Sequence, residues 1–207
     1  MSLPASEFGS LGANLALLLG GLGIAALLYR QAQAQQSRTL HYMFGLGALS
    51  LALAALGRLS LTPTTQEQQT LRLMLDNLAY YAGLPLIASV AVAHGWQKQW
   101  SRAAWGRWLL GLFALFELLR RSDMGALYSQ SLALLTCLAL LAGVVRGCSG
   151  AMQQCALAGT LLLAAGLLVF GPAPLLGGYQ QDTLYRLALT GFVVLCGYSF
   201  SRTLQKT

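Results

Sequence analysis

The sequence predicts an all-α polytopic membrane protein, with one domain of seven transmembrane helices over residues 1–207. Three observations lead to this fold class. First, 56% of the 207 residues are hydrophobic and only 9% are charged, whereas soluble domains carry about 25% charged residues. Second, the apolar residues occur in windows of roughly 20, the length that crosses a bilayer as a helix. Third, the connections between the windows are short, so neighbouring helices are expected to pack antiparallel.

Seven apolar windows follow one another along the chain, and each is expected to form one transmembrane helix. The fourth window is the weakest, because its apolar run is short and Glu117, Arg120 and Arg121 lie at its end. The seven windows are Leu11–Tyr29, His41–Leu61, Leu71–His94, Ala104–Leu119, Tyr128–Val145, Met152–Phe170 and Leu184–Arg202.

The basic residues indicate the orientation, because cytoplasmic loops carry an excess of Lys and Arg. With seven crossings, all six acidic residues fall on the side that has fewer basic residues. We therefore expect the N-terminus outside and the C-terminus inside, in a bacterial inner (plasma) membrane. The larger basic set, on the inside, is Arg30, Arg38, Lys98, Arg102, Arg107, Arg146, Arg202 and Lys206; the smaller set is Arg58, Arg72, Arg120, Arg121 and Arg186.

The third and seventh windows are similar to each other. Aligning Arg72 with Arg186 also aligns Gly83 with Gly197, and both segments begin with paired glutamines followed by Thr-Leu. This similarity favours a 3+1+3 parallel repeat, in which three helices, a linker helix and three more helices run in the same order. Parallel repeats of this kind occur in small transporters. Chance matches between Leu/Ala-rich windows are the alternative explanation.

The third window is unusually polar for a membrane span. It carries Asp76, Asn77, Tyr80 and Tyr81, and polar groups inside hydrocarbon usually face protein or a watery cavity. Asp76 and Tyr80 are four residues apart and therefore share one face of the helix. Pro85 is expected to kink the helix below the tyrosines.

Several ionisable and polar residues fall at a similar depth on the outer side. Arginine side chains there could hold an anionic or zwitterionic group through their forked donors. The structural alternative is that the arginines reach to the interface and that Glu117 pairs along its own helix. The candidate ligand-binding residues are Arg58, Arg72, Asp76, Asn77, Tyr80, Tyr81, Glu117, Arg120 and Arg186.

Asp76 is the residue of this set that most needs a partner, because a nearby cation stabilises an ionised carboxylate. We expect it to contact Arg58 or Arg186 from a neighbouring helix. We also expect Asn77, Tyr80 or Tyr81 to complete its hydrogen bonds. Arg72, four residues earlier on the same helix, is a lesser candidate.

Known catalytic and metal-binding motifs are absent from the sequence. It has no GxSxG or HExxH motif, and its four cysteines form no CxxC pair. His41 and His94 are expected near the cytoplasmic surface, but no third ligand has a fitting spacing. We therefore predict no metal site and no cofactor. The basic residues are scattered between apolar windows, so no nucleic-acid partner is expected.

Three functions are compatible with these residues. The first is binding or transport of a small polar or lipid-like ligand in an outward-facing polar pocket, as in a transporter or sensor. The second is a membrane-embedded lipid-modifying enzyme with Asp76 as acid or base, to which Glu117 or Asp182 would add a second carboxylate. The third is an accessory subunit, with a membrane-protein partner or a homo-oligomer. Membrane lipids surround the protein in all three.

Overall fold

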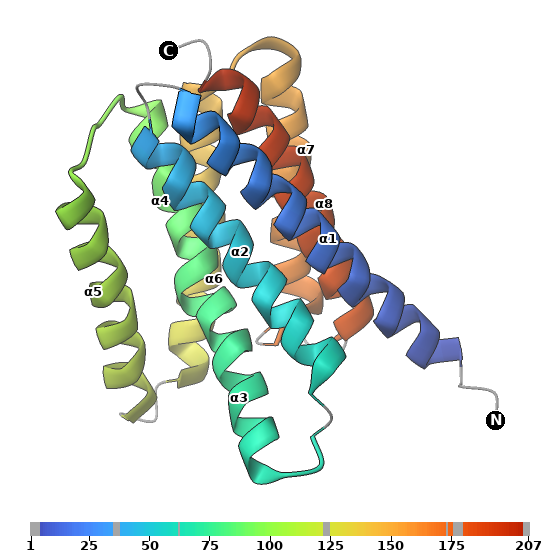
Figure 1. The fold of residues 1–207 in the computed structure, drawn as a ribbon. Helices are drawn as coiled ribbons and strands as arrows, with labels where there is room; N and C mark the ends of the chain where they lie inside the picture. Colours follow the sequence, from blue (N-terminus) through green and yellow to red (C-terminus); the bar gives the residue numbers. More distant parts are fainter. Residues whose placement is uncertain are drawn as a thin grey trace.

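The computed structural model is an all-helical bundle (Figure 1) and describes residues 5–34, 38–61, 63–121, 125–172, 174–175 and 180–204. The described residues form α-helices and two short π-helical segments, η1 and η2, and contain no β-strand. The elements are α1 (Ala5–Ala34), α2 (Arg38–Ser60), α3 (Gln66–Asn77), η1 (Leu78–Gly83), α4 (Leu84–Gly95), α5 (Arg102–Arg121), α6 (Gly125–Gly147), α7 (Gly150–Ala165), η2 (Gly166–Phe170) and α8 (Asp182–Thr203).

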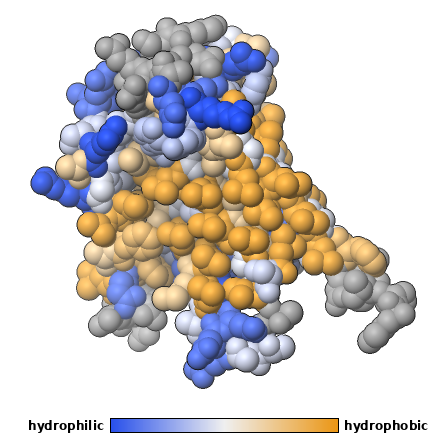
Figure 2. Space-filling view, in the orientation of Figure 1, coloured by the Kyte–Doolittle hydropathy of each residue, from blue (hydrophilic) through white to orange (hydrophobic). Residues whose placement is uncertain are grey.

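Six helical stretches in the described residues are long and apolar enough to cross a membrane. Figure 2 shows the consequence on the face in view: a broad hydrophobic band crosses the bundle, and hydrophilic residues gather at its two ends. The chain is therefore an integral membrane protein. The six stretches are Phe8–Gln33, Thr39–Ser60, Gln66–Gly95, Gly125–Gly147, Gly150–Phe170 and Asp182–Thr203.

The window predicted over Ala104–Leu119 folds into helix α5 but is not among these six stretches. Charged residues at both ends of α5 leave too little uninterrupted apolar sequence. In Figure 1, α5 runs beside the bundle from one end towards the other, and its side chains contact η1 and α4 through Phe116 and Trp108. Six of the seven predicted spans are thus helices long and apolar enough to cross a membrane, and the crossing by α5 stays a prediction. The charged residues of α5 are Arg102, Arg107, Glu117, Arg120 and Arg121.

The bundle core is formed by close contacts between α1 and α2, α1 and α8, α7 and α8, and α4 and α6. Phe44 of α2 and Phe200 of α8 are fully buried, with ring centroids 5.4 Å apart. Small residues let the backbones approach, as is usual between membrane helices. At Gly143 of α6, an added Cβ would lie 2.6 Å from the carbonyl oxygen of Ala91 in α4.

The third membrane stretch is interrupted by η1 between α3 and α4. Pro85 lies in the first turn of α4, and proline has no N–H with which to continue an α-helical ladder. The wider π-helical turn immediately before it accommodates this missing donor. An irregularity near Pro85 was expected, but it includes Tyr80 and Tyr81 instead of lying below them. On the N-terminal side of η1, α3 has no buried residue and projects beyond the neighbouring helices (Figure 1).

Replacement of Gly143 by alanine is expected to destabilise the bundle, because the new methyl group would push α6 away from α4. Overpacking of this kind costs about 1–3 kcal/mol. Gly23→Ala is the matched control, since an added Cβ at Gly23 meets nothing within 4 Å. Thermal unfolding in detergent should show a lower midpoint for Gly143→Ala and an unchanged or higher one for Gly23→Ala. Equal midpoints would contradict the close α4–α6 contact.

Candidate functional site

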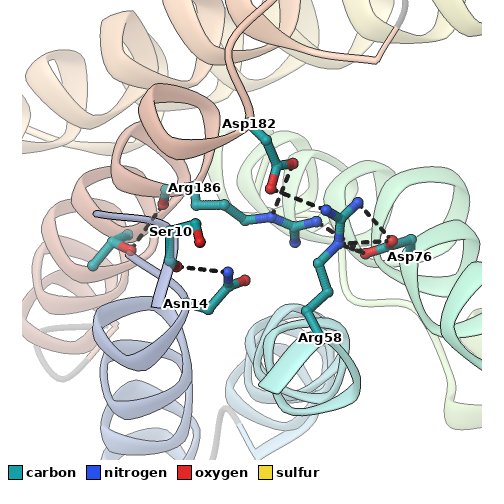
Figure 3. Close-up of polar contacts among 7 residues, drawn as sticks. Ser10, Asn14, Arg58, Asp76, Asp182 and Arg186 are labelled. Carbon is teal, nitrogen blue, oxygen red and sulfur yellow. Dashed lines mark hydrogen bonds and ion pairs between the residues drawn. The ribbon is translucent and has the colours of Figure 1, made fainter. Parts of the chain in front are cut away.

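Four charged side chains from three helices meet near one end of the bundle (Figure 3). Arg58 comes from the last turn of α2, Asp76 from the end of α3, and Asp182 and Arg186 from the first two turns of α8. Asp182 and Arg186 are four residues apart and share one face of α8. We call these four residues the ionic cluster. It joins α2, α3 and α8 through charged groups of both signs.

Asp76 accepts hydrogen bonds from both arginines of the ionic cluster. Arg58 Nη2 lies 2.8 Å from Asp76 Oδ2, and Arg58 Nε donates to the same oxygen at 3.0 Å. Arg186 Nη2 donates to Asp76 Oδ1 at 3.1 Å. The expected contact of Asp76 with Arg58 or Arg186 is confirmed, and it is made with both. Each carboxylate oxygen therefore has a cationic partner.

Asp182 is the second carboxylate of the cluster. Its Oδ2 accepts a hydrogen bond from Arg58 Nη1 at 2.9 Å. Its Oδ1 lies 3.5 Å from Arg186 Nε, close enough for an ion pair, although Arg186 Nε makes no hydrogen bond among the described residues. Two arginines and two aspartates thus balance each other in charge.

The four side chains differ in exposure. The Arg186 side chain is only 3% exposed, whereas those of Arg58 and Asp76 are 23% and 20% exposed and that of Asp182 is 47% exposed. A guanidinium has five N–H donors. Among the described residues, the N–H donors of Arg186 make one well-formed hydrogen bond, to Asp76. The guanidinium also forms an ion pair with Asp182 and lies over the ring of Tyr185 at 5.6 Å, and its remaining N–H donors could bind water, an ion or a ligand.

A cavity of about 230 Å³ adjoins the ionic cluster. It lies between α2, α3, η1, η2 and α8, and all four members of the ionic cluster line it. The rest of its wall is aromatic, aliphatic and amide in character. The remaining lining residues are Leu51, Leu73, Asn77, Ala79, Tyr80, Tyr81, Phe170, Gly171, Pro172, Gln180, Tyr185 and Leu189.

The tyrosines of η1 line the cavity but do not hydrogen-bond to Asp76. Tyr80 Oη donates to the carbonyl oxygen of Ser129 at 3.1 Å, and Tyr81 Oη lies 2.6 Å from Ser129 Oγ. Tyr81 also stacks on Phe116 of α5 and Tyr128 of α6. The expectation that Asn77, Tyr80 or Tyr81 completes the hydrogen bonds of Asp76 is therefore wrong: among the described residues, neither Asn77 nor the two tyrosines bond to it. Their hydroxyl groups connect η1 to α6 instead.

The structure places some of the other predicted site residues at the cavity and others away from it. Asn77 lines the cavity, whereas Arg72 and Glu117 do not. Arg72 is half-buried, and no hydrogen bond or ion pair links it to the other described residues. Glu117 lies on α5, away from the ionic cluster. The side chain of Arg120 lies outside the part of the chain that the structure describes.

Sequence reasoning missed the place of Asp182 in the cluster and considered it only as a second carboxylate of an enzyme. Its position four residues before Arg186, at the start of an apolar window, was the signal available. Asn14 of α1 was missed as well. It is buried, and its Nδ2 donates to the carbonyl oxygen of Ser10 at 2.8 Å. A single Asn in an apolar window carries no indication of its partner.

The histidines and cysteines form no comparable site. His41 and His94 are buried at the other end of the bundle, and His94 Nε2 lies 3.1 Å from the carbonyl oxygen of Gly147. The cysteines are unpaired thiols, and burial raises the pKa of Cys148 between α6 and α7. Among the described residues, no group of three or more His, Cys, Asp or Glu residues could hold a metal ion.

Substitution of Asp76 by alanine is expected to lower the free energy of unfolding by about 3 kcal/mol, because it leaves the charge of Arg186 buried without its closest partner. Adding Arg186→Ala should recover part of this loss. Glu67→Ala, an exposed carboxylate on the same helix, is the control and should change stability by less than about 0.5 kcal/mol. Denaturant unfolding in detergent measures the wild type, Asp76→Ala, Arg186→Ala, the double variant and Glu67→Ala. Losses that simply add in the double variant would refute the coupling.

Comparison with known protein families, with curated proteins and with solved structures finds no match for this chain. The ionic cluster and its cavity are therefore the features of the molecule that bear on its function.

Proposed function

We propose that this membrane protein binds or transports a small polar or lipid-like ligand in the cavity beside the ionic cluster. One observation carries the proposal: the wall of the cavity contains the guanidinium of Arg186, which is buried and has only one well-formed hydrogen bond among the described residues. A buried donor without an acceptor costs about 1–3 kcal/mol. A ligand with acceptor oxygens would supply the missing hydrogen bonds.

The chemical make-up of the cavity supports binding of an organic solute. Ligand sites are mostly apolar concave surfaces with a few well-placed polar groups. Here Leu51, Leu189 and Phe170 supply apolar surface, and the ionic cluster supplies polar groups on one side. Charged hydrogen bonds are stronger where water is excluded, so the cluster can orient a ligand that enters between α2 and α8.

An enzymatic role for Asp76 is less well supported. A general acid or base must have an oxygen that can exchange a proton with the substrate. Both oxygens of Asp76 already accept hydrogen bonds from Arg58 and Arg186. This arrangement favours holding a ligand over proton transfer. A role as an accessory subunit would require no polar cavity at all.

The proposal includes seven crossings, with α5 as the seventh. The beginning of α1 and the end of α8 lie towards opposite ends of the bundle (Figure 1). A chain that starts at one end and finishes at the other crosses an odd number of times. The six apolar stretches therefore need α5 as a further crossing. The excess of basic residues at the α8 end then favours an outside N-terminus and an inside C-terminus. In this orientation the ionic cluster and its cavity lie in the outer half of the membrane.

The proposed topology also allows the 3+1+3 repeat. If a two-fold relation linked the first three crossings to the last three, the α4–α6 contact would correspond to the α8–α1 contact. Both contacts are present. Arg72 and Arg186 differ, however, since only Arg186 belongs to the ionic cluster. Any repeat has therefore diverged at the site itself.

The topology is tested with reporters inserted at two exposed turns. A reporter after Lys98, between α4 and α5, is expected to report the cytoplasm, because that turn lies at the strongly basic end. A reporter after Thr64, between α2 and α3, should report the exterior. Alkaline phosphatase and a fluorescent protein give opposite signals at each position. The reverse pattern would place the cavity on the cytoplasmic side.

Filling the cavity tests the binding function without changing a charge. Ala79 lines the cavity and is 6% exposed, so Ala79→Leu should occupy part of the space and exclude the ligand. Small molecules and lipids that co-purify with the protein would be identified by mass spectrometry. We expect a component that is present with the wild type and depleted with Ala79→Leu.

Ala26→Leu is the control for this experiment, because Ala26 is exposed on the apolar surface of α1. It should retain the component. Identical profiles for the wild type, Ala79→Leu and Ala26→Leu would argue against a ligand in the cavity.

A further inference from the structure

We propose that the ligand is a small zwitterion, whose anionic group binds Arg186 and whose cationic group lies against Asp182 and the aromatic wall of the cavity. This inference rests on the proposed binding function and goes further by assigning the net charge and the orientation of the ligand. The shared chemistry is an anionic oxygen group and an ammonium group in one short molecule. A free solute or the headgroup of a zwitterionic lipid could supply it.

The net charge of the ligand follows from the charge balance of the cavity wall. Arg58 and Arg186 are matched by Asp76 and Asp182 through the ion pairs of the cluster. A ligand with a net charge would bring an unmatched charge into a partly desolvated site, which is costly. A zwitterion leaves the sum of charges at zero and still provides a partner of each sign.

The anionic end is assigned to Arg186. Arg186 lines the cavity, and among the described residues its guanidinium makes one well-formed hydrogen bond, from Nη2 to Asp76. By contrast, Arg58 already donates to both Asp76 and Asp182. Carboxylates and phosphates accept two parallel hydrogen bonds from one guanidinium. Arg186 therefore has the donors that an anionic group requires.

The cationic end is assigned to the Asp182 side of the cavity. Asp182 is the most exposed member of the cluster, at 47%, and no described residue donates a hydrogen bond to its Oδ1. Tyr80 and Phe170 also line the cavity, and aromatic rings attract cations. An ammonium group there would be held by one carboxylate oxygen and by the aromatic rings.

The volume limits the ligand to a small molecule. A cavity of about 230 Å³ corresponds to about eight water molecules at ~30 Å³ each. An organic zwitterion of roughly that number of non-hydrogen atoms fits, for example a short amino acid or a betaine. For a lipid, only the headgroup would enter, and the acyl chains would remain in the bilayer.

The test compares ligands of equal shape and different charge. The first set is glycine betaine with its isosteres 3,3-dimethylbutyrate, an anion, and choline, a cation. The second set is β-alanine with butyrate and 3-aminopropanol. Binding to the purified protein, in nanodiscs of phosphatidylglycerol, is measured by calorimetry. In at least one set we expect the zwitterion to bind roughly tenfold or more tightly than both single-charge isosteres, as one charged hydrogen bond provides.

Two variants test the assigned orientation. Asp182→Asn should weaken zwitterion binding about tenfold and leave the binding of the anion unchanged or tighter. Arg186→Lys should weaken both, because lysine cannot form the forked pair of hydrogen bonds. Glu67→Gln is the matched control at an exposed carboxylate of α3 and should change none of the affinities. Circular dichroism confirms that each variant is folded.

The lipid source is separated from the soluble one by the membrane composition. If a lipid headgroup occupies the site, replacing phosphatidylglycerol by phosphatidylethanolamine should raise the unfolding temperature of the wild type and of Glu67→Gln, but not of Asp182→Asn. This zwitterionic headgroup should also compete with glycine betaine or β-alanine. Competition by the headgroup that is lost in Asp182→Asn would support the inference, just as direct binding of a solute would.

Two results would overturn the inference. One is a single-charge isostere that binds as tightly as the zwitterion in both sets, which would leave the binding function standing with a different ligand class. The other is the absence of binding by both zwitterions together with no effect of the zwitterionic lipid. The binding function itself is then judged by the depletion of the co-purifying component in Ala79→Leu.

Discussion

The burial of one guanidinium, that of Arg186, is the constraint on which the arrangement of the helix ends depends. A charge in a membrane-embedded bundle requires a partner, and Arg186 obtains one from Asp76 on another helix at 3.1 Å. Asp76 in turn requires Arg58, and Arg58 contacts Asp182 at the start of α8. Because lipid-facing apolar surface provides little drive for helices to associate in a given order, these polar contacts determine how α2, α3 and α8 meet.

Under the proposed function, the same cluster would connect stability with ligand recognition. Its ion pairs join three helices, and its four residues line the cavity. A site that holds a polar ligand must keep some hydrogen-bonding groups unsatisfied in its absence, whereas a structural ion pair tends to satisfy all of them. The ionic cluster combines the two, since Asp76 is bonded at both oxygens and Arg186 is bonded mainly at one nitrogen.

The sequence predicted the helices and part of the site. The apolar windows were sufficient to find the helices, and Asp76 was recognisable because a carboxylate within an apolar window requires a partner. Arg58 and Arg186 were expected as its partners, because alternating crossings place the end of the second window and the beginnings of the third and seventh windows on the same side of the membrane. The hydrogen bonds of Tyr80 and Tyr81 to Ser129 depend on how η1 rotates their side chains, which residue spacing does not determine. Asp182 was not predicted to belong to the cluster, because it lies just before its apolar window, where a charged residue costs little free energy. The position of α5 depends on tertiary contacts that its own composition does not reveal.

The π-helical segment η1 has a consequence for the phase of the helix on either side of it. A π-helical turn contains one residue more than the α-helical turn it replaces. The α3 part of the third membrane stretch is therefore rotated relative to the α4 part by about 100°, the angle that one residue contributes in an α-helix. A deletion of one residue within Leu78–Gly83 would restore a continuous α-helix and turn Asp76 away from both arginines. In this segment, the length of the chain matters as much as the identity of its residues.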